Sequence, residues 1–258
     1  MEQTATADTK SSVAPLPEVF DLLDGMPRQR GSATACAAAV PAAVPAPGIR
    51  FPRVWRLLPT PTGTPFTFGY AALLAVTSLF ATYASSPLVN ALYQASSTDV
   101  AHLVREPGEV LVASALWVAG GFTSPYVACF LLVLTALERR VGGARTAVVF
   151  VFGHVLATLA TEGTVGVSVL VGDLPGTSLH RLDFGISFGV ATSLGALAGL
   201  LPPWLRWPML TLFAAMLIDD LSTFTDPMTD WGHLISLAIG VSTWPLLRRW
   251  QRTRRAVA

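Results

Sequence analysis

The chain has 258 residues, of which 52% are hydrophobic and only 13% are charged, and its formal net charge is +1. Soluble globular proteins carry about 25% charged residues, so this chain has too little charge to cover a surface that faces water. The near-neutral charge also excludes a role that depends on nonspecific binding of nucleic acid, which needs a strongly basic face.

The first 48 residues are rich in Ala, Pro, Ser and Thr and contain no long apolar run. Such a stretch cannot bury enough apolar surface to fold, and we expect a disordered cytoplasmic tail over 1–48. It lacks the charged region followed by an apolar region that marks a secretory signal. The expected domain plan is this tail, a membrane domain over 49–250 and a basic cytoplasmic end over 251–258.

Six apolar segments follow the tail, each close to the roughly 20 residues that cross a bilayer as a helix. We place them at 66–84, 119–137, 146–165, 184–200, 207–221 and 231–247. A further apolar stretch, Val110 to Ala119, is too short to cross and is expected to dip partway into the membrane. The sequence therefore predicts an all-α polytopic membrane protein, a bundle of six transmembrane helices in a lipid bilayer.

The positive residues orient this bundle. If the tail is inside, 15 of the 17 Lys and Arg residues fall on the cytoplasmic side, and only Arg105 and Arg181 fall outside. We therefore expect a multi-pass protein of the plasma membrane with both termini cytoplasmic. The basic end from Arg248 to Arg255, with Trp244 and Trp250, is interpreted as an anchor on anionic lipid.

Polar residues inside spans are costly and suggest function. The candidates are Ser187 in the fourth span, His233 in the sixth and His154 in the third, the last with a possible auxiliary role or a plain packing role. Small residues recur near the first two, which allows helices to approach closely. The expected helix-packing residues are Gly195, Gly199, Gly232, Ser236 and Gly240.

Ser187 and His233 are predicted to lie at similar depth. Ser187 is four residues past Asp183, about 6 Å along a helix, and His233 is three past Asp230, about 4.5 Å. A serine becomes a nucleophile when a histidine within about 3 Å removes its proton. The pair could thus form a catalytic dyad, although an isolated serine in a membrane helix is usually structural.

Several of these motifs resemble those of rhomboid intramembrane proteases. The segment 185–189, Gly-Ile-Ser-Phe-Gly, is similar to the nucleophile motif of that family, and 230–233 with Gly240 is similar to its last helix. The segment 138–142 resembles the end of its second span, and 107–119 its membrane-dipping loop. The resemblance implies a six-helix rhomboid-like fold and cleavage of membrane-embedded substrates, with Ser187 as nucleophile and His233 as base.

The chain also departs from the family. Rhomboid proteases usually carry His-x-x-x-Asn early in the second span to hold the oxyanion, and the corresponding positions here are near Phe122 and Tyr126. Phe188 replaces a glycine after the serine and is expected to crowd the site. Gly185, Phe188, Tyr126 and Phe122 are the residues expected to line it.

Two functions therefore stay open: a slow serine protease, or an inactive rhomboid-like protein that binds or escorts transmembrane clients. A transporter is less favoured because no inverted repeat is visible. Acidic residues of the external loops, such as Asp219 and Asp226, could suggest a cation site, but the charge asymmetry of the loops explains them equally well. The two cysteines, Cys36 and Cys129, are too few for a zinc site, and we expect no metal or cofactor.

Overall fold

The computed structural model describes residues 57–257, with side chains as far as Arg254. Within this part of the chain the regular structure is helical and there is no strand, which confirms the predicted all-α class. The expected tail over 1–48 lies outside the described residues. The α-helices are α1 (Pro65–Tyr83), α2 (Ser86–Ala95), α3 (Val100–Arg105), α4 (Pro107–Ser114), α5 (Pro125–Val141), α6 (Gly143–Leu170), α7 (Ser187–Ala198), α8 (Pro203–Ser222), α9 (Pro227–Ser242) and α10 (Trp244–Val257).

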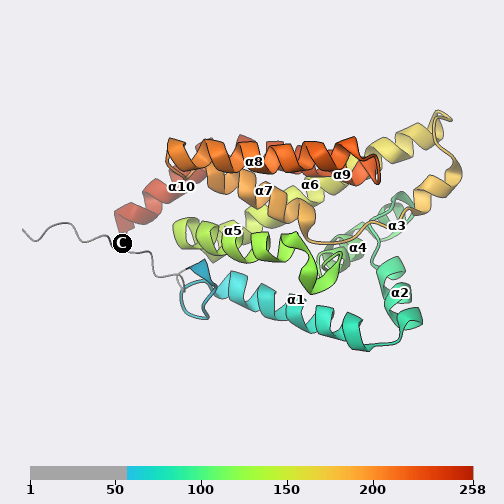
Figure 1. Ribbon diagram of the computed structural model, residues 1–258, viewed down its shortest axis with the longest axis horizontal. Helices are drawn as coiled ribbons and strands as arrows, with labels where there is room; N and C mark the ends of the chain where they lie inside the picture. Colours follow the sequence, from blue (N-terminus) through green and yellow to red (C-terminus); the bar gives the residue numbers. More distant parts are fainter. Residues whose placement is uncertain (1–56, 258) are drawn as a thin grey trace, which may run out of the picture. The chain divides into compact units, whose positions relative to one another are not determined.

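The long helices run side by side, with α2 to α4 near one end and α10 near the other (Figure 1). Two of the described helices, α1 and α6, are long and apolar enough to cross a membrane by length and hydropathy alone. Five helices, α1, α4, α5, α8 and α9, have proline at their start, where the missing N–H is not needed and the fixed φ favours the helix.

Several predicted span limits are wrong. The second span begins at Pro125 and not at 119, because Gly120 and Gly121 take positive φ angles of 79° and 62° and break the apolar run. The sixth ends at Ser242, and a separate helix, α10, begins at Trp244 and continues through the basic end. Hydrophobicity alone cannot mark such breaks, since they lie within apolar sequence.

The fourth span is the helix α7, which has only 12 residues and every residue from Phe188 to Ala198 buried. It packs against α5, α6, α8 and α9, so it is enclosed by protein and not by lipid. Irregular backbone at membrane depth is tolerated where protein surrounds it. This explains how a helix too short to cross a bilayer can occupy the middle of the bundle.

The contact of α7 with α9 is backbone against backbone. A Cβ atom added at Gly240 would lie 2.1 Å from the carbonyl oxygen of Thr192, and one added at Gly195 would lie 2.5 Å from that of Leu237. The Thr192 hydroxyl also donates to the carbonyl of Ser236 across the contact, at 3.0 Å. Small residues at these positions thus permit the two helices to meet.

Aromatic rings pack against two other glycines of the predicted packing set. A Cβ at Gly232 would meet the ring of Phe188, at 2.4 Å, and one at Gly199 would meet the indole of Trp244, at 2.2 Å. Gly199 therefore faces the start of α10 and not α9.

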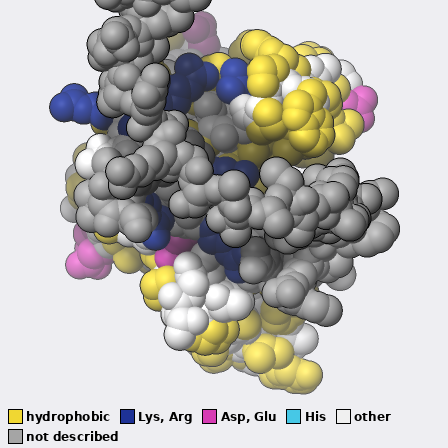
Figure 2. All heavy atoms as spheres, turned by 90° about the vertical axis from the view of Figure 1, so that its left-hand side faces the viewer, with side chains coloured by type: hydrophobic (Ala, Val, Ile, Leu, Met, Phe, Trp, Pro, Cys, Tyr) yellow, Lys and Arg dark blue, Asp and Glu magenta, His cyan; other side chains and the backbone are white. Residues whose placement is uncertain are grey.

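Arginines close the end of the bundle at which α7 stops. Arg206 donates to the carbonyls of Ala198 and Leu201, at 2.9 and 2.7 Å, and Arg248 donates to that of Gly199, at 3.1 Å. Both guanidinium groups also lie over the indole of Trp244. Cations at a helix C-terminus satisfy its free carbonyls and its dipole. Figure 2 looks onto this end of the molecule and shows basic side chains there, which are arginines in the described part of the chain.

Candidate active site

A cavity of about 460 Å³ brings Ser187 and His233 together. It lies where the loop before α7 meets the starts of α5 and α9. Its walls include Val118, Tyr126, Asp183, Gly185, Ile186, Asp226 and Thr229. Of the predicted site residues, Ser187, His233, Gly185 and Tyr126 therefore share one cavity.

Ser187 is the first residue of α7 and is half-buried. The first backbone bond of this helix runs from Val190 N–H to Ile186 C=O, at 3.0 Å. The amides of Ser187, Phe188 and Gly189 therefore have no acceptor within the helix, and the positive end of the helix dipole lies among them. Such a helix start favours a developing negative charge beside the serine.

The chain turns sharply just before the serine. Gly185 has a φ of 127°, in a region that side-chain-bearing residues rarely adopt. Its N–H donates to the carbonyl of Ser114 at the end of α4, at 3.0 Å. The backbone leading to Ser187 is thus held by the segment that was predicted to dip into the membrane.

His233 lies in the first turns of α9 with 6% of its surface exposed. Its ring stacks on Tyr126, with centroids 5.2 Å apart, and meets the edge of Phe188 at 5.3 Å. Neither ring nitrogen has a hydrogen-bond partner in the described part of the chain. Ser187 and His233 therefore line one cavity without being hydrogen-bonded to each other.

Two predicted lining residues do not line this cavity. Phe122 is 50% exposed and instead lines a separate apolar cavity between α1 and α5. Phe188 is buried, and its ring points onto Gly232 and His233 of α9. Its ring therefore packs on the histidine and is not among the cavity walls, while the expectation that it crowds a bound substrate stays a prediction.

Tyr126 is one of the two residues that the sequence predicts near the oxyanion site. Its hydroxyl oxygen is buried and has no hydrogen-bond partner among residues 57–254. The residue lines the cavity, and its ring packs on His233.

His154, the possible auxiliary residue, does not line the cavity. Its Nε2 lies 3.1 Å from the hydroxyl of Ser114 and 3.2 Å from the carbonyl oxygen of Leu111. Both contacts are with α4, so His154 joins the middle of α6 to that helix.

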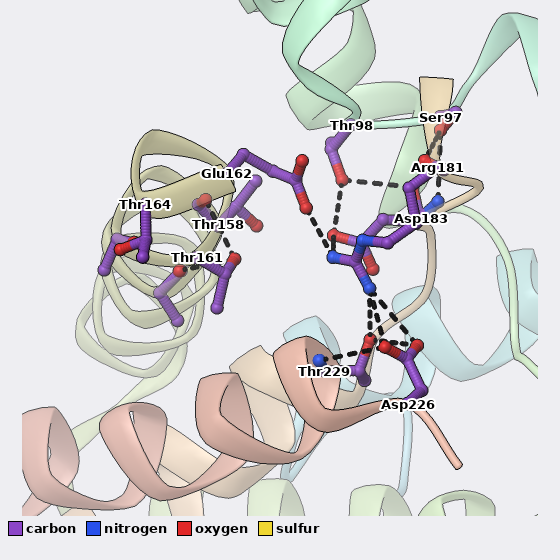
Figure 3. Close-up of polar contacts among 12 residues, drawn as sticks. Ser97, Thr98, Thr158, Thr161, Glu162, Thr164, Arg181, Asp183, Asp226 and Thr229 are labelled. Carbon is purple, nitrogen blue, oxygen red and sulfur yellow. Dashed lines mark hydrogen bonds and ion pairs between the residues drawn. The ribbon is translucent and has the colours of Figure 1, made fainter. Parts of the chain in front are cut away.

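Sequence reasoning missed a polar network around Arg181, beside the cavity. Figure 3 shows its guanidinium between Glu162 of α6 and Asp226 at the start of α9. It donates to Asp226 at 2.9 Å and to the Thr229 hydroxyl at 3.0 Å, and it also pairs with Glu162. The Arg181 network thus ties α6 and the loop before α7 to the start of the helix that carries His233.

Asp183 extends the network towards the serine. The Thr98 hydroxyl donates to its carboxylate at 3.1 Å, and the Thr98 amide donates to its carbonyl at 2.7 Å. Burial raises the pKa of Asp183, although Arg181 and the Thr98 hydroxyl oppose that shift. Burial also tends to lower the pKa of Arg181, but its carboxylate neighbours raise it more, so the guanidinium stays charged.

In the described range, no group of three or more His, Cys, Asp or Glu side chains could hold a metal ion. Asp226, one of the acidic residues considered for a cation site, is committed to Arg181 and Thr229.

The fold is thus a helical bundle around a buried short helix, α7, whose first residue, Ser187, shares a cavity with His233 of α9. Residues 62–253 match the family described as rhomboid-like protein. The chain therefore belongs to the rhomboid-like family and is an integral membrane protein. No curated protein and no solved structure matches it.

Proposed function

We propose that this chain is an intramembrane serine protease of the rhomboid type, which cleaves membrane-embedded substrates with Ser187 and His233. The observation that carries the proposal is the shared cavity. A serine at an anion-favouring helix start and a histidine with two unpartnered nitrogens line the same 460 Å³ space.

In this mechanism a substrate carbonyl enters the cavity and the His233 ring rotates or shifts to accept the Ser187 proton. The serine oxygen forms a bond to the carbonyl carbon, and the negative charge moves to the carbonyl oxygen. The free amides at the start of α7 and the Tyr126 hydroxyl stabilise this charge. The C–N bond then breaks as His233 gives its proton to the leaving amine. In the second half His233 takes a proton from water, the water oxygen bonds to the acyl carbon, and the proton returns to Ser187 as the ester bond breaks.

The reaction is expected to be slow. Of the two positions that carry the family's oxyanion side chains, Phe122 lies outside the cavity and only Tyr126 has a donor. Each missing donor costs about 10² to 10³ in turnover.

The second function is an inactive rhomboid-like protein that binds or escorts transmembrane clients. It is favoured by the lack of a hydrogen bond between Ser187 and His233 and by the missing oxyanion histidine and asparagine. The fold and cavity would then serve for recognition alone.

Labelling with a fluorophosphonate distinguishes the two functions. The purified protein is treated with a fluorescent probe beside Ser187→Ala, and we expect weak, time-dependent labelling that the variant loses. Equal signals from the two proteins, together with unchanged biological activity of the variant, would assign the protein to the inactive class.

We also propose that the protein lies in the plasma membrane with both termini cytoplasmic, so that the cavity opens outwards. The arginine-rich end around α10 supports this orientation. A single cysteine at Arg252, in a background without Cys36 and Cys129, should react with an impermeant maleimide only after the cells are opened. Efficient reaction in intact cells would contradict the orientation.

A further inference from the structure

The C-terminal end of α4 is fastened on several sides. The Tyr70 hydroxyl of α1 donates to the carbonyl of Ala115 at 2.6 Å, and the Thr77 hydroxyl donates to that of Leu116 at 2.7 Å. These contacts satisfy carbonyls that a helix end leaves free. They bind this segment to α1 but do not reach the loop before Ser187.

A second set of contacts comes from His154 in α6. Its Nε2 lies 3.2 Å from the carbonyl oxygen of Leu111, which can only accept, and the Ser114 hydroxyl donates to that same oxygen at 3.3 Å. We therefore assign the hydrogen of the ring to Nε2. The same nitrogen lies 3.1 Å from the hydroxyl of Ser114. Ser114 is fully buried and His154 is 4% exposed, so no water competes for these bonds.

Ser114 also contacts the loop that leads to Ser187. Its carbonyl accepts the N–H of Gly185 at 3.0 Å. A Cβ added at Gly185 would lie 3.7 Å from the Trp117 carbonyl oxygen and from the Ala119 amide, just past α4. Gly185 is two residues before Ser187 and has a backbone conformation of positive φ. A change at Ser114 therefore changes the direction in which the chain enters α7.

We infer that His154 is a positioning residue, which fixes Ser114 and through it the turn at Gly185 and the amides beside Ser187. His154 does not act on substrate, since it does not line the cavity. The effect on chemistry rests on the proposed function, but the chain of hydrogen bonds from His154 to Gly185 does not.

Two substitutions at His154 separate hydrogen bonding from packing. Glutamine places an amide donor near the position of the histidine Nε2, whereas asparagine places it near that of Nδ1. His154→Gln should keep the bond to Ser114 and His154→Asn should lose it. Ser114→Ala removes the other partner, and Tyr70→Phe is a matched control that removes a bond to the neighbouring Ala115.

The first measurement is hydrogen–deuterium exchange of the full chain in detergent, resolved to the Gly185 amide. We expect His154→Asn and Ser114→Ala to speed this exchange about fivefold, the effect of losing about one hydrogen bond. His154→Gln and Tyr70→Phe should match the wild type. Exchange at the wild-type rate in both His154→Asn and Ser114→Ala would overturn the inference.

The second measurement is the rate of fluorophosphonate labelling at Ser187, compared at temperatures at which all variants are equally folded. The His154→Asn/Ser114→Ala double variant is included. Because both changes break one link, the double variant should lose no more than either single variant, about fivefold. Faster exchange with an unchanged labelling rate would overturn the positioning role. A wild type that does not label would instead refute the proposed function, while exchange at Gly185 still decides the inference.

Discussion

Two serine–histidine pairs in the described residues differ in hydrogen bonding and in access to a cavity. Ser114 and His154 are hydrogen-bonded at 3.1 Å, and both are buried. Ser187 and His233 have no hydrogen bond to each other, but they share a cavity of about 460 Å³. His154 borders a separate, mainly apolar cavity of about 220 Å³, whereas both members of the open pair line the larger cavity.

The difference shows that a short serine–histidine distance alone does not identify a nucleophile. A catalytic serine needs a base, a place for the oxyanion and space for a carbonyl. The start of α7 supplies free amides next to Ser187, whereas Ser114 is the last residue of α4, where the dipole is negative. An oxyanion is therefore favoured beside Ser187 and disfavoured beside Ser114.

The sharpest way to break this comparison is to remove each histidine. His233→Ala should lower the rate of fluorophosphonate labelling by at least about 10³-fold, because the base is lost. His154→Ala should retain labelling to within about tenfold of the wild type. Similar losses in the two variants would mean that the pairs do not differ in role. The rates are read from fluorescence in gels over time.

The open pair also depends on the close approach of α7 and α9. Gly240→Leu should destabilise the protein by about 3 kcal/mol, since its side chain has to displace the backbone at Thr192. The control is Gly163→Leu, at an exposed position of α6 where an added Cβ meets nothing within 4 Å. Thermal unfolding followed by circular dichroism measures both. Equal midpoints for the two variants would contradict the packing account.

The Tyr126 hydroxyl tests the oxyanion site of the open pair. Tyr126→Phe keeps the ring that stacks on His233 and removes only the oxygen. Labelling should slow by about 10²-fold, the value of one oxyanion donor. Tyr70→Phe, which removes the α1 hydroxyl that donates to the carbonyl of Ala115, should have no such effect. An unchanged rate in Tyr126→Phe would exclude this donor.

The smallest expected effect concerns the Arg181 network. Asp226→Asn retains a good N-cap for α9 but removes the charge that faces Arg181. We expect a loss of about 1 kcal/mol, because Asp226 is half-exposed and its ion pair is screened. Asp219→Asn, an exposed residue of α8, is the control. No difference between the two melting temperatures would show that the network does not stabilise the start of α9.

Features with a local, repeating pattern could be predicted from the sequence. Gly195 and Gly240 lie in ladders of small residues, and both helices meet there. Depth along a helix paired Ser187 with His233, but the premise was wrong: residues 183–186 are not helical, and α7 begins at Ser187 itself. The Ser114–His154 bond and the Arg181–Asp226 pair could not be predicted in this way. Their partners are 40 and 45 residues apart, and no periodicity relates them.

The first and last residues of the helices were harder to predict than the presence of the helices. The break at Gly120 and Gly121 lies within an apolar run, and only its positive φ angles show it. Phe122 was predicted near the site on the assumption that one helix is continuous over 119–137, whereas α5 begins at Pro125 and Phe122 lines another cavity.

Mapping the fluorophosphonate adduct by peptide mass spectrometry tests the central claim most directly. The wild-type protein is labelled to completion and digested, and each serine peptide is searched for the adduct. We predict one adduct, on the peptide that contains Ser187, and none on the peptide that contains Ser114. No adduct, or an adduct on Ser114 or another serine, would contradict the assignment of Ser187 as the nucleophile.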